Sequence, residues 1–305
     1  MTSPDVTLVE VGPRDGFQGI GPFIPTQNKI AFLQRLFAAG LREIEIGSYV
    51  SAKALPQMAD TPELLAACTA VPDLSPRVLV PSLKHALRAL DDGVTFPTFV
   101  LSVSESHNRN NVKRHPDESV GEYLQIVEAL PDNADLRLDL STCFDCPFEG
   151  QVDEEAVLRL LEKLVPAMPG AEICLCDTTG KAEPQQVERL FSMARATFPQ
   201  VDRWAVHAHD TYGLGLANVY AAYRTGVRIV DASFAGLGGC PFAPGATGNV
   251  ATEDVVWMFH RMGIPTGVDL DDLIPVACDG AGIRGGQSGG RVRAAIAART
   301  SARCD

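Results

Sequence analysis

Short apolar stretches alternate with longer amphipathic stretches along most of the chain. The apolar stretches have the length of β-strands and are bounded by glycine, proline or small polar residues. The amphipathic stretches have the periodicity and the capping residues of helices. We predict strands at Val6 to Val11, Glu43 to Ile46, Arg77 to Val80, Phe96 to Val103, Leu136 to Leu140, Glu172 to Cys176, Trp204 to Ala208 and Arg228 to Phe234. We predict helices at Pro25 to Ala39, Thr61 to Ala70, Ser82 to Leu90, Asp117 to Leu130, Asp153 to Met168, Pro184 to Thr197, Gly213 to Arg224 and Thr252 to Met262.

Strand–helix units in strict alternation favour an α/β fold of the TIM (β/α)8 barrel type. A doubly wound open sheet is the alternative, but no GxGxxG follows the first predicted strand. Polar residues also follow the carboxyl ends of several strands, which in a barrel converge on one mouth. We expect residues 1–265 to form the catalytic barrel and residues 266–305 to form a C-terminal helical extension packed on or near its mouth.

Two histidines end the seventh predicted strand. His207 and His209 are two residues apart, so they share one face of the strand. Two neutral imidazoles on one face are a natural pair of metal ligands, although they can also be separate core or surface histidines. Asp15, after the first strand, can complete a divalent-metal site, and Asn249 can add a carbonyl oxygen. This set suits Mg²⁺, Mn²⁺ or Zn²⁺.

Further charged residues accompany these ligands at the strand ends. Arg14 adjoins Asp15 and keeps its charge at neutral pH, so it can stabilise an enolate or thioester oxyanion. Its alternative role is a structural salt bridge to Glu45 or Asp177. Either carboxylate can instead orient a ligand.

Four cysteines occur as two close pairs, Cys143 with Cys146 and Cys174 with Cys176. They can be interpreted as a four-thiolate zinc site or as buried reduced thiols. Structural zinc sites usually come from knuckles and short turns rather than barrel strands. We therefore favour buried thiols.

Composition narrows the class of protein. The net charge of −12 disfavours a nucleic-acid or membrane-surface role. No apolar run reaches the roughly 20 residues of a transmembrane helix. The first residues do not have the pattern of a secretory signal, and eight cysteines then suggest reduced thiols. We expect a cytoplasmic protein that acts on a small molecule, with neither nucleic acid nor membrane as partner; homo-oligomer formation is allowed.

Four motifs carry a resemblance to a known family. They are Val9-Glu-Val-Gly-Pro-Arg-Asp-Gly16, the segment Glu45 to Asp60, His207-Ala-His-Asp-Thr-Tyr-Gly213, and Gly236-Leu-Gly-Gly-Cys-Pro241 with the following residues to Asn249. With these motifs the chain strongly resembles hydroxymethylglutaryl-CoA lyase, a metal-dependent TIM-barrel lyase. The resemblance covers most of residues 6–275.

The resemblance implies an activity and a role for each matching residue. The activity is cleavage of 3-hydroxy-3-methylglutaryl-CoA to acetyl-CoA and acetoacetate, with Mg²⁺ or Mn²⁺ as cofactor. The implied metal ligands are Asp15, His207, His209 and Asn249. The implied catalytic residues are Arg14 for the enolate, Cys240 as the thiol that relays a proton, and Asp15, Glu45 and His207. The substrate-binding residues are Arg14, Gln18, Ser48 and Asp177. The base is Asp15 or a histidine.

The chain also departs from the usual family pattern, at Phe17 to Ile20, Asp145, Cys174 to Cys176 and Gly280 to Gly290. A related 3-hydroxyacyl-CoA is therefore an alternative substrate. A synthase of the isopropylmalate or homocitrate type is a second alternative, although such enzymes usually carry a large C-terminal domain and lack the Gly-Gly-Cys-Pro loop. A barrel that binds an acyl-CoA without turnover is a third. The candidates for CoA phosphate contacts are Lys53, Lys84, Lys113, Arg114 and Arg291.

Overall fold

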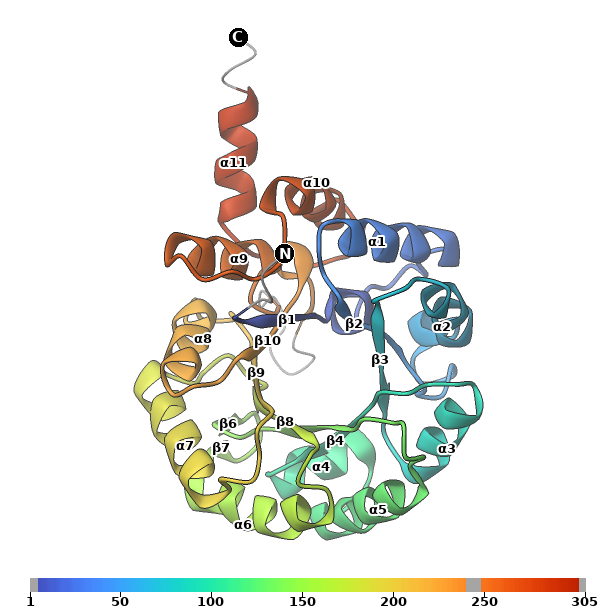
Figure 1. Ribbon diagram of the computed structural model, residues 1–305, viewed down its shortest axis with the longest axis vertical. Helices are drawn as coiled ribbons and strands as arrows, with labels where there is room; N and C mark the ends of the chain where they lie inside the picture. Colours follow the sequence, from blue (N-terminus) through green and yellow to red (C-terminus); the bar gives the residue numbers. More distant parts are fainter. Residues whose placement is uncertain (1–4, 240–247, 302–305) are drawn as a thin grey trace.

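All eight predicted strands form a closed parallel barrel in the computed structural model, which describes residues 5–239 and 248–301 (Figure 1). The strands are β1 (Thr7–Glu10), β2 (Glu43–Ser48), β3 (Ser75–Val80), β4 (Pro97–Ser102), β5 (Arg137–Ser141), β8 (Glu172–Asp177), β9 (Trp204–Ala208) and β10 (Ile229–Ala232). β1 pairs with β2 on one side and with β10 on the other. This pairing closes the sheet, so the (β/α)8 prediction is confirmed and the open-sheet alternative is wrong.

Helices surround this barrel as an outer ring (Figure 1). They are α1 (Thr26–Ala38), α2 (Thr61–Thr69), α3 (Leu83–Asp91), α4 (Glu105–Val112), α5 (Pro116–Ala129), α6 (Glu154–Leu164), α7 (Pro184–Thr197), α8 (Gly215–Arg224) and α9 (Thr252–Arg261), followed by α10 (Leu270–Ala281) and α11 (Val292–Ser301). The eight predicted helices are all present. The helix predicted to reach Met168 ends at Leu164 and continues as the 3-10 turn Val165–Ala167. Pro166 lacks the N–H that a longer α-helix needs.

Two small elements were not predicted. α4 has a polar sequence without an apolar stripe, so its periodicity gives no helical signal. Its start is marked by Ser104, whose Oγ accepts a hydrogen bond from the backbone N–H of His107 at 3.1 Å. A short hairpin, β6 (Asp145–Cys146) with β7 (Gly150–Gln151), lies between β5 and α6.

Charged side chains fill part of the barrel interior. Glu172 on β8 is fully buried and accepts hydrogen bonds from Arg77, Arg137 and Arg203. The Nη2 of Arg77 lies 3.0 Å from its Oε2, and the Nη1 of Arg137 lies 2.8 Å from its Oε1. Buried charges are tolerated when they are paired in this way. Neighbouring residues of the same strands, Leu138, Ile173 and Leu175 among them, belong to the main hydrophobic core.

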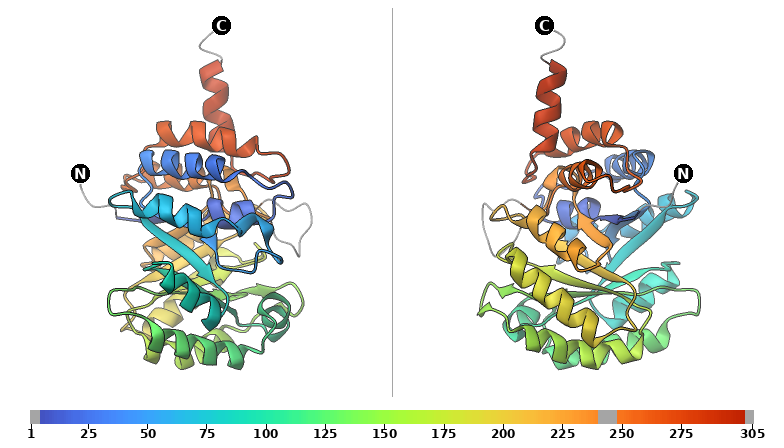
Figure 2. Two further views of the ribbon diagram at one scale, coloured as in Figure 1. Left: turned by 90° about the vertical axis from the view of Figure 1, so that its right-hand side faces the viewer. Right: turned by 60° about the vertical axis from the view of Figure 1, so that its left-hand side comes forward.

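The C-terminal segment begins beside the N-terminal part of the barrel. α10 packs against α1 and α9, and the two views of Figure 2 show α1 and α10 side by side. α11 starts where the Asp254 carboxylate accepts the backbone N–H groups of Arg291 and Val292, and it then projects away from the barrel. Between α10 and α11, the N–H of Gly289 donates to the carbonyl of Ala235 at 2.8 Å. The division into a barrel and a separate extension stays a prediction.

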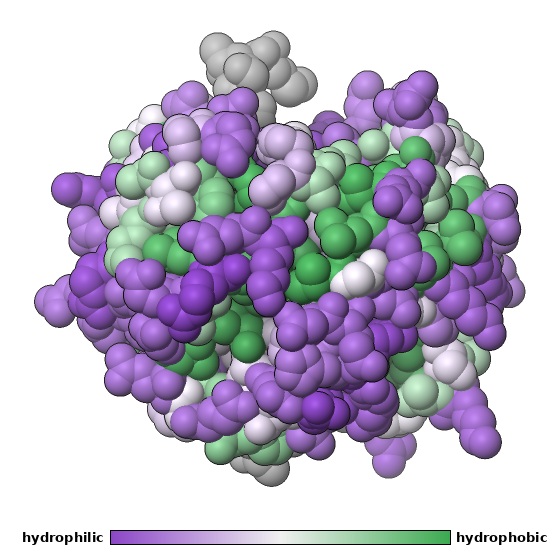
Figure 3. Space-filling model, turned by 90° about the horizontal axis from the view of Figure 1, so that it is seen from below, coloured by the Kyte–Doolittle hydropathy of each residue, from purple (hydrophilic) through white to green (hydrophobic). Residues whose placement is uncertain are grey.

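The face in Figure 3 is mainly hydrophilic, and its apolar side chains gather in a band across the view. None of the helices in the described part of the chain combines the length and the apolar character needed to span a bilayer.

Candidate active site

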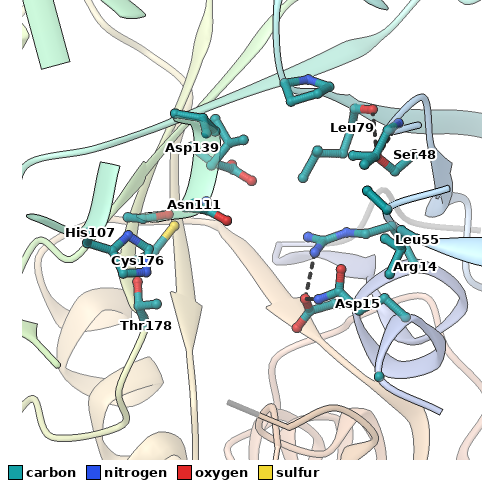
Figure 4. Close-up of a pocket in the computed structure, with 18 of the residues that line it drawn as sticks. Arg14, Asp15, Ser48, Leu55, Leu79, His107, Asn111, Asp139, Cys176 and Thr178 are labelled. Atoms are coloured by element: carbon teal, nitrogen blue, oxygen red, sulfur yellow. Dashed lines mark hydrogen bonds and ion pairs between the residues drawn. The ribbon is translucent and has the colours of Figure 1, made fainter. Parts of the chain in front are cut away.

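A cavity of about 560 Å³ opens where the strands end, and most of the predicted site residues meet there (Figure 4). Its predicted lining residues are Arg14, Asp15, Gln18, Ser48, His207 and His209. In Figure 4, Arg14 and Asp15 lie on one side of the cavity, and His107, Cys176 and Thr178 lie on the other. The cavity is therefore at the carboxyl ends of the strands, where TIM barrels carry their active sites.

Arg14 and Asp15 are presented by a single turn of π-helix, Gly12–Gly16, directly after β1. The backbone N–H groups of both residues donate to the carbonyl of Val11, at 3.1 and 2.7 Å. Pro13 has no N–H and a fixed φ, so it suits the start of this turn. The turn directs two adjacent side chains of opposite charge toward one cavity.

Three potential metal ligands converge in this cavity. One ligand atom from each of Asp15, His207 and His209 lies within 4.8 Å of the others, and all three residues are buried. The ring centroids of the two imidazoles are 5.2 Å apart. A carboxylate with two imidazoles on one side of a cavity fits a divalent cation with open positions for a substrate.

Asn249 supports the same assignment. It pairs with His209 in an isolated antiparallel bridge, and its Nδ2 donates to Asp15 Oδ2 at 2.7 Å. Its Oδ1 is buried without a hydrogen-bond partner among the described residues, as is the Nδ1 of His209. A buried acceptor without a partner is costly unless something else binds it. These atoms fit a cation site.

Arg14 connects two carboxylates. Its Nε donates to Glu45 Oε2 at 2.6 Å, and its Nη1 donates to Asp15 Oδ1 at 2.5 Å. Gln18 also donates to Asp15 through its Nε2. Among the two salt-bridge partners considered for Arg14, Glu45 is the one that it contacts. Both Asp15 oxygens thus accept hydrogen bonds from neighbouring side chains.

The charges in the site shift one another's protonation. Burial opposes ionisation of Asp15, but Arg14 and the two imidazoles outweigh it and lower the pKa of Asp15 to about 2. Burial and the neighbouring His207 lower the pKa of His209 to about 4. An ionised carboxylate and a neutral imidazole are the forms that bind a metal.

Asp177 and Ser48 lie at the ends of their strands. The Oδ2 of Asp177 accepts the backbone N–H of Ala182 at 3.2 Å, and its Oδ1 is buried without a partner among the described residues. Burial raises the pKa of Asp177 to about 6. Asp177 does not itself line the cavity, whereas Ser48 does, and the Ser48 hydroxyl donates to the carbonyl of Leu79 at 3.2 Å.

A sequence model of the HMGL-like family matches residues 5–278 of the chain. The chain belongs to the HMGL-like family. The resemblance inferred from the four motifs is thereby confirmed, and the match spans the whole barrel and most of α10.

Similar proteins agree with this assignment. The hydroxymethylglutaryl-CoA lyase of Bacillus subtilis is 40% identical over 273 residues, which cover 89% of this chain and 91% of that protein. A Pseudomonas aeruginosa protein is named 3-hydroxy-3-isohexenylglutaryl-CoA/hydroxymethylglutaryl-CoA lyase. It is 37% identical over 295 residues, which cover 96% of this chain and 98% of that protein. A solved HMG-CoA lyase from Acinetobacter baumannii, in complex with coenzyme A and 3-methylmalate, is 39% identical with a TM-score of 0.88, over 96% of this chain and 95% of that one.

One residue of the expected catalytic set, Cys240, lies outside the described residues. The remaining cysteines with close spacing are buried free thiols. Cys146 contacts the Ser104 hydroxyl at 2.9 Å, and Cys143 donates to the Leu140 carbonyl at 3.0 Å. Within the described ranges, 5–239 and 248–301, no group of four thiolates forms. The interpretation as reduced thiols is the better one for this member of the HMGL-like family.

A second group of residues could also bind a metal. One ligand atom from each of Asp139, Cys174 and Cys176 lies within 4.8 Å of the others. The Nε of Arg137 donates to Asp139 Oδ1 at 2.6 Å. This guanidinium already neutralises the carboxylate, so it disfavours an additional cation there. In this HMGL-like chain, the first group is therefore the stronger candidate for a metal.

Sequence reasoning missed several residues around the site. Asp231 accepts a hydrogen bond from His207, Arg137 contacts Asp231, and His107 forms part of the cavity wall. A signal for Arg137 was present in β5, where charged residues alternate with leucines, whereas β10 offers Asp231 as a single charged residue in an apolar run. In a TIM barrel, one of two alternating sets points inward.

Proposed function

We propose that this lyase cleaves 3-hydroxy-3-methylglutaryl-CoA to acetyl-CoA and acetoacetate, with Mg²⁺ or Mn²⁺ as its cation. The observation that carries the proposal is the convergence of Asp15, His207 and His209 beside Arg14 in one buried cavity. The names of the relatives supply the substrate class, because the Bacillus subtilis and Pseudomonas aeruginosa relatives are named as lyases of this acyl-CoA.

Each residue of the site would have its own role in the reaction. Asp15, His207, His209 and Asn249 would hold the cation, which when bound supplies the Lewis acidity that lowers the pKa of the substrate's tertiary hydroxyl. Asp15 or a histidine would accept the hydroxyl proton as the carbon–carbon bond breaks. Acetoacetate is then released, and the electron pair remains on the enolate of acetyl-CoA.

Arg14 and Cys240 would complete the reaction. The Arg14 guanidinium lines the cavity while its Nε is held by Glu45, so it can face a developing enolate oxygen without reorganising. Cys240 would deliver or relay a proton to the enolate carbon, which gives acetyl-CoA. Gln18 and Ser48 line the same cavity and would contact the acyl group, whereas Asp177 is not among its lining residues.

Two basic side chains of the cavity lining would bind the phosphates of the CoA portion. Lys113 and Arg114 line the cavity, and Arg114 is held by a hydrogen bond from its Nη1 to the Pro81 carbonyl at 2.8 Å. Of the five basic residues considered from the sequence, Lys113 and Arg114 are the ones that reach the cavity. A local positive region can attract CoA phosphates in spite of the negative net charge.

The test is a turnover assay of the purified protein with Mg²⁺ or Mn²⁺. We expect acetoacetate and acetyl-CoA to form in equal amounts from 3-hydroxy-3-methylglutaryl-CoA. The isohexenyl analogue, suggested by the Pseudomonas aeruginosa relative, is the competing substrate. A much higher kcat/KM for that analogue would replace the proposed substrate within the same reaction. No cleavage of either compound would overturn the proposal.

A further inference from the structure

His207 is held from behind by a carboxylate on the neighbouring strand. Its Nδ1 lies 2.9 Å from Oδ2 of Asp231, and both side chains are buried. His207 is on β9 and Asp231 is on β10, which pair in parallel. The contact uses the imidazole nitrogen that an Nε2-bound cation would leave free.

Asp231 in turn is held by a rigid support. The Nη2 of Arg137 donates to the same Oδ2 of Asp231 at 2.5 Å. The other nitrogens of Arg137 donate to Asp139 Oδ1 at 2.6 Å and to Glu172 Oε1 at 2.8 Å. The guanidinium is only 2% exposed and is fixed by carboxylates from three strands. It cannot turn away from Asp231 without breaking these ion pairs.

An ionised carboxylate can only accept hydrogen bonds. Because Asp231 faces Nδ1, the neutral His207 ring must carry its proton on Nδ1 and leave the Nε2 lone pair free. His209 differs, since its Nδ1 has no hydrogen-bond partner among the described residues. The two imidazoles of the pair are thus unequal: one has a defined tautomer before any ligand binds.

We propose that Asp231 is a positioning residue that fixes the tautomer and ring orientation of His207 for cation binding, with Arg137 as its support. This inference rests on the proposed cation site. Outer carboxylates that orient ligating histidines typically change metal affinity by about 10–100-fold when they are removed.

The main test is Asp231→Ala. Arg137 and His207 both contact Oδ2 of Asp231, so an asparagine would keep its carbonyl at that position and still accept from both groups. Alanine removes the acceptor, and the ring orientation and tautomer of His207 are then no longer fixed. We expect the dissociation constant for Mn²⁺, measured by electron paramagnetic resonance, to rise by about 10–100-fold.

The control is Asp60→Ala. Asp60 is also a buried carboxylate in an ion pair, 2.8 Å from the Lys29 Nζ, and it does not line the cavity. If Asp231 had only a structural role, both variants would lose thermal stability and both would keep the Mn²⁺ affinity of the wild type. We expect unchanged Mn²⁺ affinity only in Asp60→Ala.

A second measurement needs no variant. In wild-type protein without metal and with ¹⁵N-labelled histidine, at a pH where His207 is neutral, the chemical shifts should show a proton on Nδ1 and none on Nε2. The opposite tautomer would overturn the inference even if Asp231→Ala does not fold. Unchanged Mn²⁺ affinity in folded Asp231→Ala would also overturn it and leave the proposed lyase intact. Failure of the wild type to bind Mn²⁺ would overturn the cation site and this inference together.

Discussion

Arg14 and Glu45 form a buried ion pair across the first two strands of the barrel, with Nε 2.6 Å from Oε2. The same guanidinium contacts Asp15 at its other end and lines the cavity. The two roles considered for Arg14, a structural salt bridge and charge stabilisation at the substrate, are therefore compatible. Glu45 fixes the guanidinium in the place from which it can face an enolate.

Arg14→Gln should therefore change both turnover and stability. We expect turnover to fall by about 10²-fold or more, as after the loss of an oxyanion donor, while the Michaelis constant moves little. The free energy of unfolding should fall by about 3–5 kcal/mol, because Glu45 would remain buried without its partner. Steady-state kinetics and urea unfolding measure the two effects.

The double variant Arg14→Gln with Glu45→Gln separates the effect on turnover from the effect on stability. Removing both charges should restore much of the stability and none of the turnover. Near-normal turnover in a stable Arg14→Gln variant would exclude the enolate role. A double variant as unstable as the single one would mean that Glu45 is not the source of the lost stability.

Removal of the metal should abolish activity. We expect dialysis against a chelator to stop acetoacetate formation and added Mg²⁺ or Mn²⁺ to restore it. His209→Ala should weaken Mn²⁺ binding, because it removes one of few protein ligands. His260→Ala is the matched control, since that imidazole lies on α9 and contacts Thr266 outside the cavity. Full activity in metal-free buffer would contradict the proposed chemistry.

The barrel and much of its site were predictable from local patterns. The strands are short stretches rich in apolar residues, some with alternating charged residues, that end near a glycine or a polar residue. The ends of parallel strands must converge once the sheet closes. Asp15, His207 and His209 could therefore be assigned to one cavity. Asn249 was a candidate because it follows the eighth strand and offers a carbonyl oxygen, and the family resemblance implied the same role. Its pairing with His209 was not visible in the local pattern.

The interior charges were harder to predict. Arg137 contacts Asp231, which is 94 residues away in the sequence. Alternation along a strand shows which residues point inward, but it does not show which inward residue meets which. α4 was missed for a different reason: its polar residues show no apolar periodicity, and only the cap at Ser104 marks its start.

Cys240→Ser should lower turnover strongly. A general acid or proton relay typically contributes about 10²–10⁴-fold to the rate, and serine is a far weaker acid than cysteine. Mn²⁺ affinity and the Michaelis constant should change little, because the cation is assigned to other residues. Cys278→Ser on α10 serves as the control for thiol loss, since that thiol is exposed. Normal turnover in Cys240→Ser would exclude the proposed proton relay.

The stability of the protein should depend on His107 in acid. Its imidazole is 3% exposed, and its Nδ1 lies 2.7 Å from the hydroxyl of Ser102. Burial lowers the pKa of His107 to about 4, against a partial opposing effect of Glu149. The folded protein therefore keeps His107 neutral at pH values where the unfolded chain has already bound the proton.

This difference in proton binding determines whether the free energy of unfolding rises or falls with pH. Since the unfolded state binds more protons between about pH 6.5 and pH 4, the free energy of unfolding falls as the pH drops through this window. The lowered pKa corresponds to at most about 3 kcal/mol. His107→Gln keeps a hydrogen-bonding group beside Ser102 but does not titrate. Urea unfolding of both proteins between pH 7 and pH 4 should show that the wild type loses its advantage over this variant as the pH falls. Parallel curves for the two proteins would show that His107 is not the group responsible.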